Sequence, residues 1–143
     1  MKTSCFVIGG IGAIVVMTVI LLITGVRFER PLTAQGSALY DPAGETIVTG
    51  VVQDFKTFAC PVSEGEDGGH LFVKTENSVV RVHLAPGRIL RGQNIFFTAG
   101  DHVTVTGAKF RFEGGGDLIA REIARGNSNY VFRDRSGKLM LVQ

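Results

Sequence analysis

The stretch His70-Leu-Phe-Val-Lys-Thr-Glu-Asn-Ser-Val-Val-Arg-Val-His-Leu84 predicts a β-hairpin. Two runs rich in β-branched and aromatic residues flank a two-residue turn, Glu76-Asn77. The register that such a turn imposes pairs four apolar side chains across one face of the hairpin, Leu71 with Val82 and Val73 with Val80. We therefore expect this face to pack against a hydrophobic core.

The same register places His70 directly opposite His83 on the other face of the hairpin. Cross-strand Cβ atoms in such pairs lie about 4.5–5.5 Å apart, so the two imidazoles could share a metal ion. A carboxylate would complete the ligand set, and three acidic residues precede the first strand: Glu64, Glu66 and Asp67. The alternative, which we favour, is a pair of exposed polar residues on a solvated sheet surface. The sequence therefore assigns no metal ligand.

Strand patterns recur on both sides of the hairpin, with turn residues between them. Residues 45–55 form a long alternating run that Gly50 interrupts, which predicts a bulged first strand. A short helix is predicted within residues 85–97, where Gly92 limits its length. Further strands are expected over the ranges 102–110, 117–123, 129–133 and 138–142.

These elements follow a recognisable order: three strands, a short helical connector and two more strands, with a terminal hairpin added. It is the order of an OB-fold, a five-stranded and partly open barrel. We therefore predict a mainly β domain over residues 45–143, an OB-fold-like β-barrel with a short connecting helix. Another small β-barrel or a sandwich is the alternative.

The N-terminal part of the chain has a different character. Residues 6–26 carry no charge, and at about 1.5 Å per residue they span roughly 30 Å, the thickness of a bilayer core. A secretory signal peptide is the rival interpretation, but its apolar run would be shorter and would end at a small-x-small cleavage site. We predict a tail over 1–5, a single transmembrane helix over 6–26 and a juxtamembrane linker over 27–44.

Composition argues against several classes of protein. The net charge is only +2, without the strongly basic footprint of a nucleic-acid binder. Lys109-Phe-Arg-Phe112 does interleave cations with aromatic residues, but strand alternation predicts the aromatics on the core side and Lys109 and Arg111 in solvent. We therefore expect no nucleic-acid partner.

The chain offers little catalytic chemistry. Of the two cysteines, Cys60 is followed by Pro61, has no histidine near it in sequence, and belongs to no CxxC motif. We interpret it as a packed small residue. Phosphate-binding loops, dinucleotide fingerprints and Ser-His-Asp arrangements are not found in the sequence. The sequence predicts a protein that is not an enzyme and assigns it no cofactor.

Three runs carry a family resemblance: Val82-His-Leu-Ala-Pro86, Gly100-Asp-His-Val-Thr-Val-Thr-Gly107 and Leu118-Ile-Ala-Arg-Glu-Ile123. They resemble small bacterial OB-like domains, of which the C-terminal domains of the magnetosome proteins MamS and MamX are the named members. The resemblance covers about residues 45–142. It implies a membrane-anchored protein with a role in iron-mineral maturation, although these motifs specify a fold more than a chemistry.

One N-terminal helix followed by an OB-fold is also similar to the periplasmic haem chaperone of cytochrome c maturation. That family attaches haem through a histidine shortly after its last barrel strand. Here the run 124–130 supplies Tyr130 but no histidine, so we expect no covalent haem. Both resemblances imply a periplasmic domain, with the N-terminus in the cytoplasm and residues 31–143 outside.

Together these features predict a single-pass protein of the bacterial inner membrane. We expect a non-enzymatic accessory or scaffold protein whose periplasmic domain binds other subunits of a membrane assembly. The alternative is metal handling, of iron as in magnetosome-type biomineralisation, or haem delivery to a respiratory complex.

Overall fold

The computed structural model describes residues 39–63 and 65–140. The predicted transmembrane segment, residues 6–26, lies outside these ranges. Among the described residues, no helix is both long and apolar enough to cross a bilayer.

The described part of the chain is mainly β, as the sequence predicts. Its helices are η1 (Pro42–Gly44), η2 (Pro61–Ser63) and α3 (Gly87–Gly92). Its strands are β1 (Glu45–Ala59), β2 (Asp67–Lys74), β3 (Val79–Pro86), β4 (His102–Phe112), β5 (Gly115–Arg125) and β6 (Ser128–Val131).

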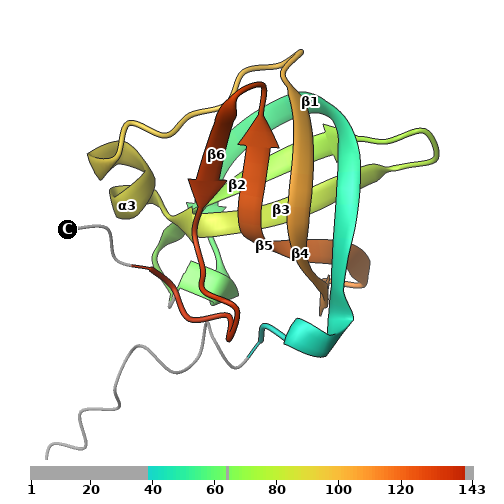
Figure 1. The fold of residues 1–143 in the computed structure, drawn as a ribbon. Helices are drawn as coiled ribbons and strands as arrows, with labels where there is room; N and C mark the ends of the chain where they lie inside the picture. Colours follow the sequence, from blue (N-terminus) through green and yellow to red (C-terminus); the bar gives the residue numbers. More distant parts are fainter. Residues whose placement is uncertain (1–38, 64, 141–143) are drawn as a thin grey trace, which may run out of the picture. The chain divides into compact units, whose positions relative to one another are not determined.

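The strands form one sheet in the order β3-β2-β1-β4-β5-β6, and an additional parallel pairing of β3 with β5 closes it. β1 belongs to both halves, because residues 45–51 pair with β4 and residues 51–59 pair with β2. In Figure 1, β4, β5 and β6 cross in front of β2 and β3, while α3 connects β3 to β4 at one end. This is the OB-like arrangement that the order of elements predicts.

The long first strand bends as expected, although the irregularity is displaced from Gly50. The pairing register with β2 shifts between Val52 and Asp54. Gly50 itself is required by a close approach, since a Cβ there would lie 2.3 Å from the carbonyl oxygen of Lys74. A glycine at this point lets β1 leave β4 and join β2.

The predicted hairpin is present in the predicted register. Leu71 pairs with Val82, Val73 with Val80 and His70 with His83, and the turn is closed by hydrogen bonds between Thr75 and Ser78. The main core inside the barrel contains Leu71, Val73, Val82 and Leu84 from this hairpin, together with Val103 and Val105 of β4 and Leu118 and Ile123 of β5. Val80 is only half-buried, because it lies near the open end of the barrel.

The C-terminal hairpin differs from the prediction. β6 ends at Val131, and its expected partner strand is represented in the described residues by a single bridge between Arg133 and Leu139. In the turn between them, the side chain of Asp134 accepts hydrogen bonds from the backbone of Ser136 and Lys138.

Candidate metal centre

The outer face of the β2–β3 hairpin is buried at His70 and His83, contrary to the expected solvated surface, whereas Lys74 and Val79 on the same face are exposed. His70 and His83 are both 0% exposed. The cover comes from β1, which runs on to Ala59, beyond the predicted range, and from the turn that follows it. The Phe58 ring stacks on His70 with centroids 3.7 Å apart, and the edge of Phe110 packs against His83 at 5.6 Å.

Cys60 lies in the turn that follows β1 and faces the histidines. Its Sγ is 3.1 Å from Nδ1 of His83, and the residue is 3% exposed. Backbone hydrogen bonds hold the turn in place, from the Cys60 amide to Glu66 and from the Ser63 amide to Cys60. Sequence reasoning placed no histidine near Cys60, because the contact depends on how the irregular segment after β1 folds back.

Asp117, at the start of β5, supports His83 from the other side. Its Oδ2 lies 2.9 Å from Nε2 of His83 and 2.8 Å from both Nε and Nη2 of Arg81. A carboxylate only accepts here, so His83 carries its proton on Nε2 and turns the lone pair of Nδ1 toward Cys60. This is how an outer carboxylate orients a metal-binding histidine.

His70 is buried without a polar partner. Neither ring nitrogen has a hydrogen bond among the described residues. Burial, assisted by the proximity of His83, lowers the pKa of His70 to about 4. The Gly68 backbone opposes part of this shift, although it forms no hydrogen bond of normal geometry with the ring. His70 is therefore neutral at physiological pH, the form that binds metals.

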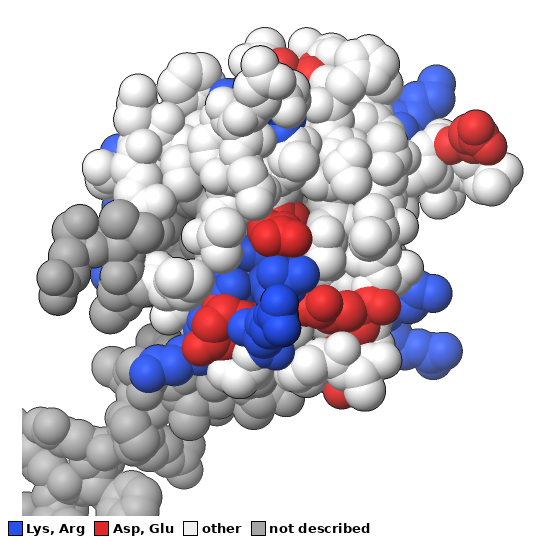
Figure 2. Space-filling view, viewed as in Figure 1, with Lys and Arg blue, Asp and Glu red and all other residues white. Residues whose placement is uncertain are grey.

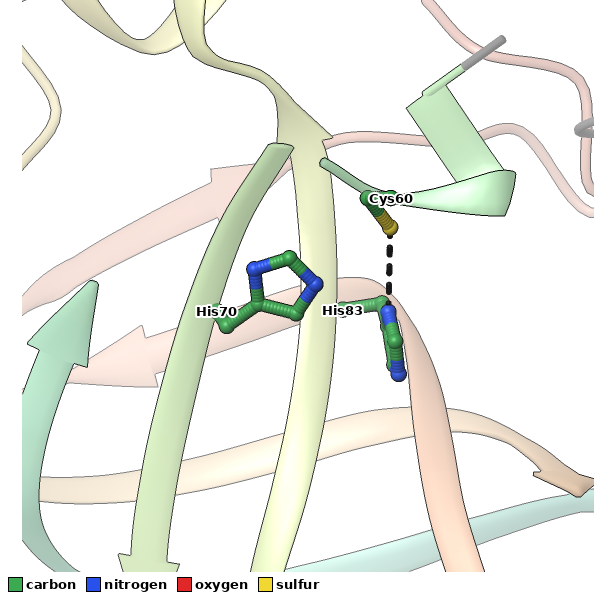
Figure 3. A group of neighbouring side chains, drawn as sticks. All are labelled: Cys60, His70 and His83. Carbon is green, nitrogen blue, oxygen red and sulfur yellow. Dashed lines mark hydrogen bonds between the residues drawn. The ribbon is translucent and has the colours of Figure 1, made fainter. Parts of the chain in front are cut away.

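The three side chains converge on one point (Figure 3), where one ring nitrogen of His70 points toward the other two residues. One donor atom from each of Cys60, His70 and His83 lies within 4.8 Å of the others. An ion bound at normal Zn–N and Zn–S lengths holds such atoms about 3.3–3.8 Å apart, so adjustments of roughly 1 Å would complete the coordination. The donor types and the preformed tautomer fit a metal ion.

Arg133 adds a positive charge to the same region. It is 2% exposed, and its Nη1 donates to the carbonyl oxygens of Leu84 at 2.5 Å and Ala120 at 2.6 Å. Within residues 39–63 and 65–140 it forms no ion pair. Burial lowers the pKa of Arg133 to about 10, while attraction to Cys60 acts in the opposite direction. A thiolate at Cys60 would therefore be stabilised by this guanidinium.

Cys60, His83 and Asp117 also have the connectivity of a nucleophilic triad. Burial, however, raises the pKa of the Cys60 thiol, whereas a catalytic cysteine needs a lowered one. A pocket of about 620 Å³ is lined by Asp117 but not by Cys60. The arrangement therefore suits coordination of an ion better than attack on a substrate.

Of the carboxylates proposed from sequence, the two that the structure describes, Glu66 and Asp67, do not join the histidines. Glu66 is exposed and pairs with Arg88 at 3.0 Å, Asp67 is exposed, and Glu64 lies outside the described residues. The carboxylate that does approach is Asp117, and sequence reasoning missed it. The predicted order of strands could have indicated this contact. Closure of an OB barrel places β5 beside β3 and brings Asp117 near His83.

Lys109 and Arg111 are exposed, as predicted. Phe110 packs against a second hydrophobic cluster, which lies outside the barrel and consists of Tyr40, Cys60, Val62, Ala108 and Ile119. Some of the other cations at the surface are paired, Arg121 with Glu45 and Glu122, and Arg125 with Asp101. Figure 2 shows basic side chains lying among acidic ones on the face in view, rather than in a continuous basic groove.

Solved structures with a similar fold include the S. pombe Stn1–Ten1 complex, at 19% identity and a TM-score of 0.45, with 59% of each chain covered. Another is the second OB-fold domain of replication protein A from Methanococcus maripaludis, at 18% identity and a TM-score of 0.42, with 59% of this chain and 85% of that chain covered. This chain thus spans less than two thirds of the Stn1–Ten1 chain it matches.

No curated protein matches the sequence. A family profile does match, over residues 45–130, which is more than half of the chain and includes the hairpin and Asp117. The chain therefore belongs to the MamS/MamX magnetosome protein family.

Proposed function

We propose that this protein is a membrane-anchored, non-enzymatic accessory protein whose OB domain binds a metal ion at Cys60, His70 and His83. One observation carries the proposal: His70 is fully buried, has no hydrogen-bond partner among the described residues, and lies beside a thiol and a second imidazole.

An unsatisfied polar group in a protein interior costs about 1–3 kcal/mol, which an apolar side chain of similar shape would avoid. His70 is stacked on Phe58 and needs no nitrogen for that contact. A metal ion would give a ring nitrogen the partner that it lacks, so ligand binding accounts for the histidine where packing does not.

Family membership supports the setting of the proposed role. In a magnetosome protein family, a metal-binding domain would act as an accessory to a membrane assembly, with other subunits of that assembly as partners. We place the apolar segment 6–26 in the inner membrane and the OB domain in the periplasm. A reporter that is active only in the periplasm, fused after Gln143, should then be active; activity of a cytoplasmic reporter instead would overturn this topology.

The metal role is tested on the full chain in mild detergent. The purified protein is stripped of metal with a chelator, offered Cu(I), Zn(II) or Fe(II) separately, and dialysed. We expect one equivalent of one of these ions to remain and the melting temperature to rise through linkage. Cys60→Ser should lose both effects.

His102→Ala is the matched control, because His102 is exposed on β4 and should leave binding unchanged. Retention of no ion by the folded protein would overturn the proposal. A stoichiometric membrane partner recovered with a metal-free protein would instead support a role in scaffolding alone.

A further inference from the structure

We propose that the ion bound by Cys60, His70 and His83 is monovalent copper. This inference rests on the proposed metal-binding function and specifies the ion that the centre selects. Three independent features of the centre point to it: the softness of the donors, their number, and the charge already buried around them.

The donors are one sulfur and two imidazole nitrogens. Thiolate is a soft ligand that favours Cu(I), Zn(II) and iron–sulfur clusters, and imidazole is compatible with copper and zinc. Ferrous iron in non-haem sites is typically held by two histidines and a carboxylate, with open positions for further ligands. The iron expected from the family resemblance is therefore a poor match for this donor set.

The number of donors is also low. Among the described residues, the carboxylate that contacts the histidines is that of Asp117, and its Oδ2 already accepts from His83 Nε2 and from Arg81. Asp117 contacts Nε2 of His83, whereas Cys60 faces Nδ1, so Asp117 orients the ring and is not one of the three grouped donors. On the remaining sides the rings of Phe58 and Phe110 contact the histidines. Zn(II) in structural sites is almost always four-coordinate, whereas a trigonal set of one sulfur and two nitrogens is a copper geometry.

The buried charge around the centre favours a monovalent ion over a divalent one. Arg81 and Asp117 form a pair without net charge, and the buried Arg133 contributes one positive charge that its carbonyl partners do not neutralise. Cu(I) binding replaces the thiol proton: the S–H bond breaks, the S–Cu bond forms and the proton leaves to solvent. The net charge of the interior then does not change, whereas a divalent ion would add one buried positive charge.

The test measures competition for the full chain in mild detergent, under anaerobic conditions with ascorbate. Cu(I) is titrated against a chromophoric Cu(I) chelator, and Zn(II) and Fe(II) are titrated in parallel against their own indicators. We expect one Cu(I) per chain, with release of one proton per ion and affinity at least about 100-fold above that for Zn(II) or Fe(II).

Two variants assign the site. Cys60→Ser replaces the soft donor with a hard one of similar size and should lower Cu(I) affinity at least about 100-fold. Asp117→Asn leaves all three ligands in place but removes the charge that orients His83, and should lower affinity about 10–100-fold. Cys5→Ser, which removes the other cysteine, should have no effect.

The outcomes separate this inference from the proposed function. Tighter binding of Zn(II) or Fe(II) than of Cu(I), lost in Cys60→Ser, would overturn the copper assignment and leave the metal function standing. Unchanged Cu(I) affinity in Cys60→Ser would overturn the site. Retention of none of the three ions would overturn both proposals.

Discussion

At its His70–His83 end, the β2–β3 hairpin is buried on both faces, but by different means. Its inner face presents Leu71, Val73 and Val82, all 0% exposed, to an apolar core. Its outer face presents His70 and His83, equally buried, to a cysteine and aromatic rings from the end of β1 and from β4. The apolar side chains of the inner face stabilise the fold. The two histidines of the outer face are polar groups that the stability of the fold does not require.

The largest effect is expected on the inner face. Val82→Asp would bury an unpartnered carboxylate at the centre of the core, at a cost of at least several kcal/mol, and should unfold the domain. Val79→Asp is the control, because Val79 is in the same strand but 50% exposed, and it should change stability by less than about 0.5 kcal/mol. Urea denaturation followed by circular dichroism measures both; equal stabilities would contradict the assignment of the faces.

The outer face should make stability depend on pH. The pKa of His70 is lowered to about 4 in the folded protein from an ordinary value of 6.5, so the unfolded chain binds more protons between these values. The free energy of unfolding is therefore highest above pH 6.5 and falls by roughly 3 kcal/mol as the pH drops toward 4. Burial also lowers the pKa of His83, which adds to the loss in the same direction.

Denaturant midpoints measured at intervals between pH 7 and pH 4 test this dependence. His70→Phe should remove the larger part of the slope, and His102→Ala should preserve it. A slope that is the same in His70→Phe and in the natural protein would mean that His70 is not the titrating group.

Asp117→Asn tests the support of the outer face in the metal-free protein. The amide keeps the shape but loses the charge that pairs with Arg81, whose side chain is 19% exposed and also pairs with Glu113 at 3.3 Å. We expect a loss of about 1–2 kcal/mol in the free energy of unfolding. Lys56, whose ion pair with Asp54 is exposed, provides the control, and Lys56→Gln should cost almost nothing.

The smallest effect should have the opposite sign. His70→Phe keeps the stacking on Phe58 and removes two unsatisfied nitrogens, so the metal-free protein should become more stable by about 1 kcal/mol at pH 7. The same variant should lose metal binding. Destabilisation by 2 kcal/mol or more would show that the ring nitrogens do have a structural partner and would remove the main support for the metal centre.

The hairpin register was predictable from sequence because a two-residue turn and four alternating apolar residues determine the same pairing. The order of strands was predictable as well. The burial of the outer face was not, because the segment that covers it, from Phe58 to Ser63, has no periodicity to reveal where it packs. Asp117 was missed for a related reason: it lies 34 positions from His83 in sequence and reaches it through the parallel β3–β5 contact.

The parallel β3–β5 contact also affects the order in which the parts of the centre come together during folding. The three ligand residues all lie between positions 60 and 83, within one strand end and the hairpin after it, so they are brought together by local folding. Asp117 arrives only when β5 docks beside β3, and such distant pairings form late because a long loop must first close. If the proposed centre binds an ion, the nascent hairpin can take it up while it is still open, and closure of the barrel would then fix the imidazole and enclose the ion.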